Sequence, residues 1–115
     1  MNKYAIYIPV NDTPRMIQLN GTLEEYQAIV EGYIESVPVF PKYAHCVMLV
    51  NEEGKLNNLP INQAATNMYG EYPFDCIAGN ALIVKRGEED LELMSEEEAN
   101  KMLERVLRFE KVVKR

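Results

Sequence analysis

Two short apolar runs constrain the fold of this chain more than any other feature. The first covers residues 44–50, and its length and composition predict a strand that is buried on both faces. The second lies within residues 75–85 and is interrupted by Gly79-Asn80. A glycine inside a strand indicates a bulge or a close approach of another backbone.

Shorter patterns predict the remaining strands. Residues 3–10 and 15–19 flank a turn-forming segment and are expected to form a β-hairpin. Residues 33–40 are interrupted by Pro38, which lacks the amide hydrogen that a central strand needs, so they predict an edge strand or a strand with a bulge. Short extended segments are expected at residues 55–59 and 91–94.

Three helices are expected at residues 22–31, 62–69 and 95–113. The first and last begin with a capping box, in which a hydroxyl and a glutamate three residues later bond to each other's backbone amides. The last helix carries an apolar stripe and is the most clearly amphipathic segment. The residues that define these signals are Thr22 and Glu25, Ser95 and Glu98, the cap Asn62, the helix stop Gly32, and the stripe Ala99, Met102, Leu103, Val106, Phe109 and Val113.

The order of these elements predicts an α+β fold. Residues 1–115 are expected to form one small domain, with a mixed or antiparallel sheet of about four to six strands and two or three helices. We expect the C-terminal amphipathic helix to pack on the sheet.

The net charge of −6 is unevenly distributed along the 115 residues. Residues 88–100 carry seven acidic side chains and no basic one, whereas residues 101–115 carry six basic and two acidic ones. Acids at the start of a helix and bases at its end suit the helix dipole, which explains part of this asymmetry. The acids that precede the helix could instead attract a partner.

Composition also limits the partners and the compartment. No run of about 18 apolar residues exists to span a membrane, and the N-terminal segment does not resemble a signal peptide. The acidic balance argues against binding to duplex DNA. Cys46 and Cys76 lack metal-site or redox spacing, and we interpret them as buried thiols in a reducing cytoplasm.

No catalytic constellation is evident, and neither a cofactor nor a metal site is expected. His45 and Cys46 are adjacent on a strand, so their side chains point to opposite faces and cannot act as a nucleophile and its base. Glu52, Glu53 and Asp75 are interpreted as solvated carboxylates rather than as a catalytic pair. The chain is therefore predicted not to be an enzyme.

Two other features allow either a structural or a binding interpretation. Residues 51–62 crowd polar side chains, including Lys55, between two apolar elements, as in a β-turn followed by a helix cap or in a binding loop. Tyr69, Tyr72 and Phe74 cluster nearby, either as half-buried aromatic residues or as a patch that faces a partner.

The order of motifs resembles a family of small proteins of unknown function that phages, plasmids and conjugative elements encode. The resemblance covers about residues 3–107 and is carried by Gly21-Thr22-Leu23-Glu24, Gly32-Tyr33-Ile34-Glu35, Asn51 to Leu56, Leu59-Pro60, Asn62 and Ile77-Ala78-Gly79-Asn80-Ala81. It implies an accessory protein of a mobile element and supplies no catalytic residue. Small acidic proteins of such elements often resemble counter-defence factors, including anti-CRISPR proteins.

The resulting functional hypothesis is a non-enzymatic anti-CRISPR inhibitor that acts in the bacterial cytoplasm. It would bind a host nuclease or its guide-RNA complex, or block guide loading, because acids can compete for a basic channel. The alternative is a binder that sequesters a nucleotide signal through the 51–62 loop, with a possible homodimer forming the pocket. The candidate partner-binding residues are Glu88, Glu89, Asp90, Glu92, Tyr69, Tyr72, Glu52, Glu53 and Lys55.

Overall fold

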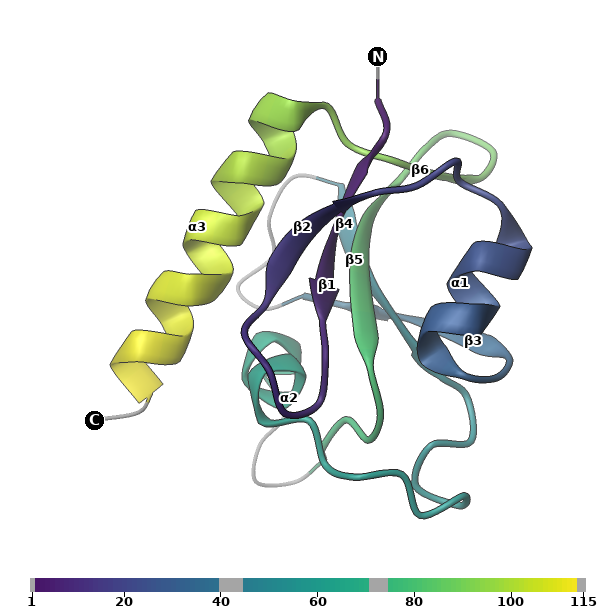
Figure 1. The fold of residues 1–115 in the computed structure, drawn as a ribbon, viewed down its shortest axis with the longest axis vertical. Helices are drawn as coiled ribbons and strands as arrows, with labels where there is room; N and C mark the ends of the chain where they lie inside the picture. The colour runs from purple at the N-terminus through teal and green to yellow at the C-terminus, as the bar shows by residue number, and fades with distance from the viewer. Residues whose placement is uncertain (1, 40–44, 71–74, 114–115) are drawn as a thin grey trace.

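Six strands form one antiparallel sheet in the order β2–β1–β5–β4–β3, and β6 pairs with the end of β5 (Figure 1). The structure is a computed structural model that describes residues 2–39, 45–70 and 75–113, with side chains described through Arg108. The strands are β1 (Tyr4–Ile8), β2 (Arg15–Gln18), β3 (Ile34–Pro38), β4 (Cys46–Asn51), β5 (Ala81–Arg86) and β6 (Leu91–Glu92), and the helices are α1 (Leu23–Val30), α2 (Gln63–Tyr69) and α3 (Glu96–Val113).

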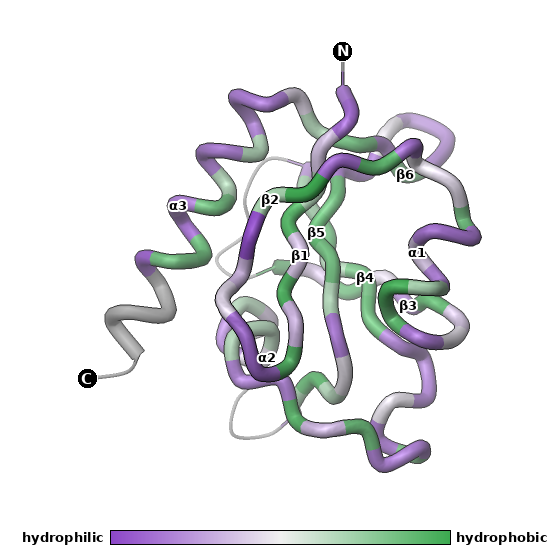
Figure 2. Tube along the Cα trace, in the orientation of Figure 1, coloured by the Kyte–Doolittle hydropathy of each residue, from purple (hydrophilic) through white to green (hydrophobic). Residues whose placement is uncertain are grey.

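Helices cover both faces of this sheet, which explains the two apolar runs. Along β4, Met48 and Val50 pack into the core under α2 and α3, whereas Val47 and Leu49 pack toward α1. The central strand β5 alternates in the same way, and both strands are apolar along most of their length (Figure 2). The prediction that the first run is a strand buried on both faces is confirmed for β4, whereas His45 is an exposed turn residue and Ala44 lies outside the described residues.

The three predicted helices are present and begin at the predicted caps. Thr22 and Glu25 form a capping box on α1, and Ser95 and Glu98 bond reciprocally at the start of α3. The Asn62 side chain caps α2. Helix α3 packs on the sheet through Ala99, Met102 and Val106, with Leu103 partly buried; the side chains of Phe109 and Val113 lie outside the described residues.

The described sheet is entirely antiparallel, and of its two end strands, β2 and β3, the sequence predicted an edge position only for β3. Strands β1 and β2 form the predicted hairpin, and β3, with Pro38 at its end, is an edge strand. The predicted strand at residues 55–59 is wrong, because this backbone closes on itself. The amide of Asn57 bonds to the Glu53 carbonyl and that of Leu59 to the Gly54 carbonyl, which leaves a series of turns.

The second apolar run becomes a strand only from Ala81. Gly79 has φ +92°, a left-handed conformation that breaks the extended backbone, and its amide bonds to the Pro60 carbonyl. This hydrogen bond confirms the expected close approach of another backbone, and the Leu59 side chain is close as well, since a Cβ at residue 79 would lie 2.8 Å from its Cδ1. None of the described helices has the length and apolar character needed to cross a bilayer.

Candidate functional site

Two asparagines at the ends of the polar segment 51–62, Asn51 and Asn62, are buried and form hydrogen bonds within the fold. Asn51 lies at the end of β4, and its amide nitrogen donates to the carbonyl oxygens of Val30 and Glu31 at 3.0 and 3.2 Å. Its side-chain oxygen accepts from the Glu53 amide at 2.7 Å. Asn51 therefore satisfies carbonyls at the end of α1 and, with the same side chain, starts the turn that follows β4.

This arrangement also explains Gly32. A Cβ at residue 32 would lie 2.7 Å from Nδ2 of Asn51, so a larger residue would displace the capping amide. The residue that ends α1 in the left-handed conformation is Glu31, with φ 65°, and not the glycine that the sequence suggested as the helix stop. Gly32 is required for a close approach rather than for a positive φ.

Asn62 joins three separate segments at the other end of the motif. Its side-chain nitrogen donates to the carbonyl oxygens of Ile8 and Gly79, each at 2.9 Å, and its oxygen accepts from the Ala65 amide at 3.0 Å. It is completely buried. Asn51 and Asn62 are therefore fully used within the fold, and the structural interpretation of the 51–62 segment holds for both of them.

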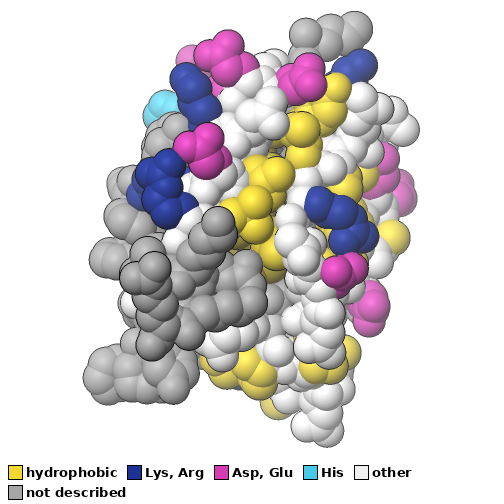
Figure 3. Space-filling view, turned by 60° about the vertical axis from the view of Figure 1, so that its left-hand side comes forward, with side chains coloured by type: hydrophobic (Ala, Val, Ile, Leu, Met, Phe, Trp, Pro, Cys, Tyr) yellow, Lys and Arg dark blue, Asp and Glu magenta, His cyan; other side chains and the backbone are white. Residues whose placement is uncertain are grey.

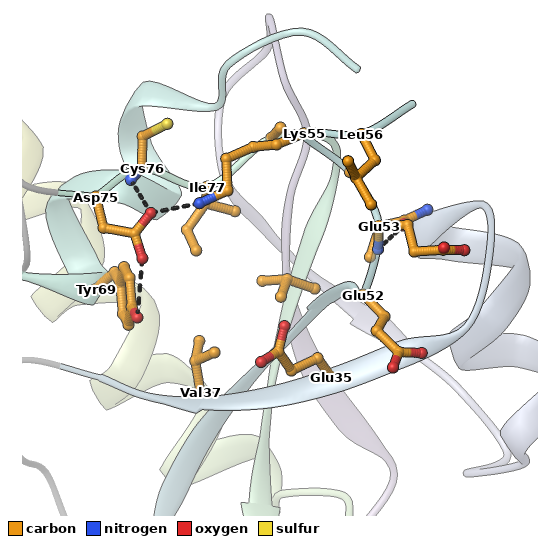
Figure 4. A pocket seen from close by; sticks show the side chains of 14 residues that line it. Glu35, Val37, Glu52, Glu53, Lys55, Leu56, Tyr69, Asp75, Cys76 and Ile77 are labelled. Atoms are coloured by element: carbon orange, nitrogen blue, oxygen red, sulfur yellow. Dashed lines mark hydrogen bonds and ion pairs between the residues drawn. The ribbon is translucent and has the colours of Figure 1, made fainter. Parts of the chain in front are cut away.

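A cleft of about 290 Å³ opens beside the turn that Asn51 begins. We call it the edge cleft because it lies between the edge strand β3, the turn at residues 52–56 and the segment that leads into β5 (Figure 4). Its lining consists of Glu35, Val37, Val50, Asn51, Glu52, Glu53, Gly54, Lys55, Leu56, Tyr69, Asp75, Cys76, Ile77 and Ala78.

Asp75 collects three hydrogen bonds on one side of the edge cleft. Lys55 Nζ forms an ion pair with Asp75 Oδ1, the Cys76 amide donates to the same oxygen at 2.8 Å, and the Tyr69 hydroxyl donates to Oδ2 at 3.3 Å (Figure 4). The hydrogen bond with Lys55 holds the pKa of Asp75 below its usual value, and the same bond raises the pKa of Lys55. The positive charge of Lys55 is thus balanced by the carboxylate of Asp75.

The cleft carboxylates argue against the nucleotide-binding alternative. Glu35, Glu52 and Glu53 are exposed and form no ion pair among the described residues, while the lysine of the cleft is already paired. A phosphate group placed here would face three negative charges with no free cation. Like charges in one site repel, so an anionic ligand is disfavoured.

The turn between β5 and β6, together with the last residue of β6, carries the second set of candidate residues. We call Glu88, Glu89, Asp90 and Glu92 the acidic turn. All four side chains are exposed, and none takes part in an ion pair within the ranges that the structure describes. Asp90 stabilises the turn, since its carboxylate accepts from the Leu91 amide and its carbonyl accepts from the Gly87 amide, both at 2.7 Å.

The acids that follow in α3 are used differently. The Glu98 carboxylate accepts a hydrogen bond from the amide of the cap residue Ser95 and forms an ion pair with Lys85 at 3.1 Å. Glu97 forms an ion pair with Lys101 at 3.4 Å. On the face shown in Figure 3, lysine and arginine side chains lie next to acidic ones rather than in a patch of one sign. The acidic charge of residues 88–100 therefore divides into the acidic turn and Glu96, which form no ion pair among the described residues, and Glu97 and Glu98, which are paired with lysines.

A family model described as a domain of unknown function, DUF3846, matches residues 1–107. The chain belongs to the DUF3846 family. No curated protein and no solved structure matches it. Family membership therefore agrees with the resemblance to proteins of unknown function and assigns no activity to this DUF3846 domain.

The DUF3846 structure separates the candidate residues into two groups. Glu52, Glu53, Lys55 and Tyr69 meet at the edge cleft, next to the start of β5, whereas the acidic turn follows the end of that strand. The two groups therefore lie at opposite ends of β5 (Figure 1). Tyr72, and Phe74 beside it, lie outside the described residues.

Two cleft residues of this DUF3846 domain were not predicted as partner-binding residues. Glu35 enters the cleft from β3, and Asp75 enters from the segment before β5. Glu35 stands two positions before the buried Val37 on the same strand, and this period of two was a usable sign that both face one side. No pattern in the sequence indicated that Asp75 would meet Lys55, which is 20 residues away.

The cysteines and the histidine form no reactive centre in the DUF3846 fold. Cys46 and Cys76 are free and only half-buried, and they lie toward opposite ends of the sheet. His45 is exposed beside β4. Desolvation raises the pKa of the Cys46 thiol, which disfavours the nucleophilic thiolate. Among the described residues, no group of three or more His, Cys, Asp or Glu side chains is arranged to hold a metal ion.

Proposed function

We propose that this DUF3846 protein is a non-enzymatic accessory protein of a mobile element that binds a basic surface of a host protein. Its most concrete partner is a CRISPR-type nuclease in the bacterial cytoplasm, which the protein would inhibit by binding it or by blocking guide-RNA loading. The observation that carries the proposal is the acidic turn. Its four exposed carboxylates are unpaired among the described residues, while Glu97 and Glu98 of α3 are each paired with a lysine.

The physical basis is electrostatic competition. A nuclease that holds a guide RNA needs a positively charged channel for its backbone. Carboxylates fixed on a short turn can enter such a channel with little loss of conformational freedom, because the hydrogen bonds of Asp90 already order the turn. Association of this kind is fast and weakens with added salt.

The test compares two variants that remove the same number of charges. The turn variant is Glu88→Gln, Glu89→Gln and Glu92→Gln, with Asp90 kept because it orders the turn. The control is Glu31→Gln, Glu96→Gln and Glu104→Gln, which removes three exposed charges from helix ends and a helix face. We expect the turn variant to inhibit purified CRISPR nucleases about tenfold more weakly than wild type at low salt.

The control should inhibit as wild type does, and the difference between the variants should shrink at high salt. Circular dichroism and urea denaturation would show that both variants fold. The proposal is wrong if the wild-type protein inhibits none of the nucleases tested, or if the turn variant inhibits as strongly as wild type at low salt.

A further inference from the structure

We infer that the edge cleft receives an arginine side chain from the partner protein. This inference rests on the proposed function, because it needs a protein partner with a basic surface. It assigns the cleft a role separate from that of the acidic turn, from which it is separated by the length of β5.

The first reason is the combination of an apolar floor with a charged rim. The buried side chains of Val37, Val50 and Ile77 line the cleft together with the exposed Glu35, Glu52 and Glu53, and the Glu35 carboxylate points into it, whereas those of Glu52 and Glu53 lie at its outer edge (Figure 4). Figure 4 shows Glu35 and Glu52 on one side and the Lys55–Asp75 pair on the other. A ligand that complements this lining has an apolar stem and a cationic end.

The second reason is that the rim charge has no internal partner. The structure pairs none of the three glutamates with a described Lys or Arg, and Lys55 is occupied by Asp75. The cleft lining therefore includes three carboxylates that form no ion pair with a described base. A bare metal ion is a poor candidate, since the described residues hold no metal-binding group and an apolar floor supplies no ligand atom.

Arginine fits this site better than lysine does. A guanidinium group is planar, is weakly hydrated and can donate to more than one carboxylate at once. Its stem of three methylene groups can lie along Val37 and Ile77 while the charged end stays at the rim. The volume, about 290 Å³, is at the lower limit for small-molecule sites and suits a single side chain.

The surroundings of the cleft favour a polypeptide over a free small cation. Leu56 lines the cleft and is 79% exposed, although it is a large apolar side chain. A partner segment that placed an arginine in the cleft would also cover Leu56, whereas a free cation would leave it in water. Burying that side chain adds a favourable apolar contribution to binding.

The experiment uses NMR titration of the isotope-labelled full chain with a blocked peptide, acetyl-Ala-Arg-Ala-amide. The matched probe is the same peptide with citrulline, which keeps the shape of arginine but carries no charge. We expect the arginine peptide to shift the backbone amides of Gly54, Lys55 and Ala78 and to saturate at millimolar concentration. The citrulline peptide should bind at least fivefold more weakly.

The test variant is Glu35→Gln, Glu52→Gln and Glu53→Gln, which keeps side-chain shape and removes the rim charge. Its affinity for the arginine peptide should fall at least fivefold, while the control variant Glu31→Gln, Glu96→Gln and Glu104→Gln, which removes the same number of charges elsewhere, should bind as wild type does. The inference is overturned if citrulline and arginine peptides bind equally, if the rim variant binds as wild type does, or if spermidine shifts the same amides at tenfold lower concentration.

These outcomes do not depend on the nuclease assay. A cleft that fails to bind the arginine peptide leaves the acidic turn and its inhibition test unaffected. If the cleft binds the peptide but the protein inhibits no nuclease, arginine recognition by the cleft is supported and the proposed partner is wrong.

Discussion

At the scale of single residues, the asparagine side chains decide how distant segments meet. An amide group donates and accepts at the same time, so Asn51 can hold two carbonyls of α1 and the Glu53 amide with one side chain. Asn80 acts similarly, because it accepts from the Val10 amide and donates to the Ile29 carbonyl. The sequence showed a polar segment at residues 51–62. It did not reveal whether these side chains stabilise the fold or bind a ligand, since the carbonyl partners of Asn51 lie about 20 residues earlier in the chain.

The substitution Asn51→Asp tests this assignment. An aspartate keeps the acceptor for Glu53 but loses both donors, and it places a negative charge against the carbonyl end of α1. We expect the free energy of unfolding to fall by about 3 kcal/mol, measured by urea denaturation at neutral pH. The control Asn57→Asp makes the same chemical change at an exposed position and should cost less than about 0.5 kcal/mol. Equal losses in the two variants would contradict the capping role.

At the scale of elements, the sequence was most informative where the signal is local. The capping boxes of α1 and α3 lie within four consecutive residues, and both were predicted correctly. The segment at residues 55–59 was assigned wrongly because it follows a tight turn and ends at Pro60, as the returning strand of a hairpin would, while its backbone amides find partners within the same series of turns. Strand formation depends on a neighbouring strand, and local pattern does not reveal whether one is available.

The α1 capping box predicts a pH dependence of stability. Glu25 accepts hydrogen bonds from the amides of Asn20, Thr22 and Gly21, and these bonds lower its pKa below the ordinary value of 4.5. A carboxyl with a lowered pKa in the folded state stabilises the fold above the pKa of the unfolded chain. That stabilisation is lost as the pH falls through the lower, folded value.

Glu25→Gln should therefore be less stable than wild type at pH 7 and should lose less stability as the pH falls below about 4.5. Urea denaturation midpoints measured from neutral to acidic pH would show this as two converging curves. Some decline remains in the variant, because Glu98 also has a lowered pKa through its bond with the Ser95 amide. Parallel curves would mean that the Glu25 carboxylate contributes nothing to the cap.

At the scale of the whole molecule, the sequence predicted the fold class but not the arrangement of the site. The α+β class, the edge position of β3 and the packing of α3 on the sheet follow from periodicity, Pro38 and amphipathicity. The division of the candidate residues between two ends of β5 does not follow, because it depends on which strands become neighbours. That Glu35 on β3 and Glu52 in the turn after β4 line the same cleft likewise requires the pairing of these two strands.

Coverage of both sheet faces predicts that neighbouring residues of β5 are equally sensitive to truncation. Leu82 is buried toward α1 and Ile83 toward α3, and both are fully inaccessible to solvent. We expect Leu82→Ala and Ile83→Ala each to reduce the free energy of unfolding by about 2–5 kcal/mol in urea denaturation. Ile17→Ala, at a half-buried position of the edge strand β2, should cost clearly less. A loss below about 1 kcal/mol for either β5 variant would contradict a sheet covered on both faces.

The central place of β5 has a consequence for synthesis on the ribosome. Strands β1 and β2 form one hairpin and β3 and β4 form another, and both pairs precede β5 in the chain. Only β5 pairs with both β1 and β4. Isolated two-stranded hairpins are marginal in water, so a nascent chain that ends before residue 81 holds two ribbons with nothing to join them. We expect stable folding to wait for residues 81–86 to leave the exit tunnel, because until then the apolar faces and inner edges of both hairpins have no strand to cover them.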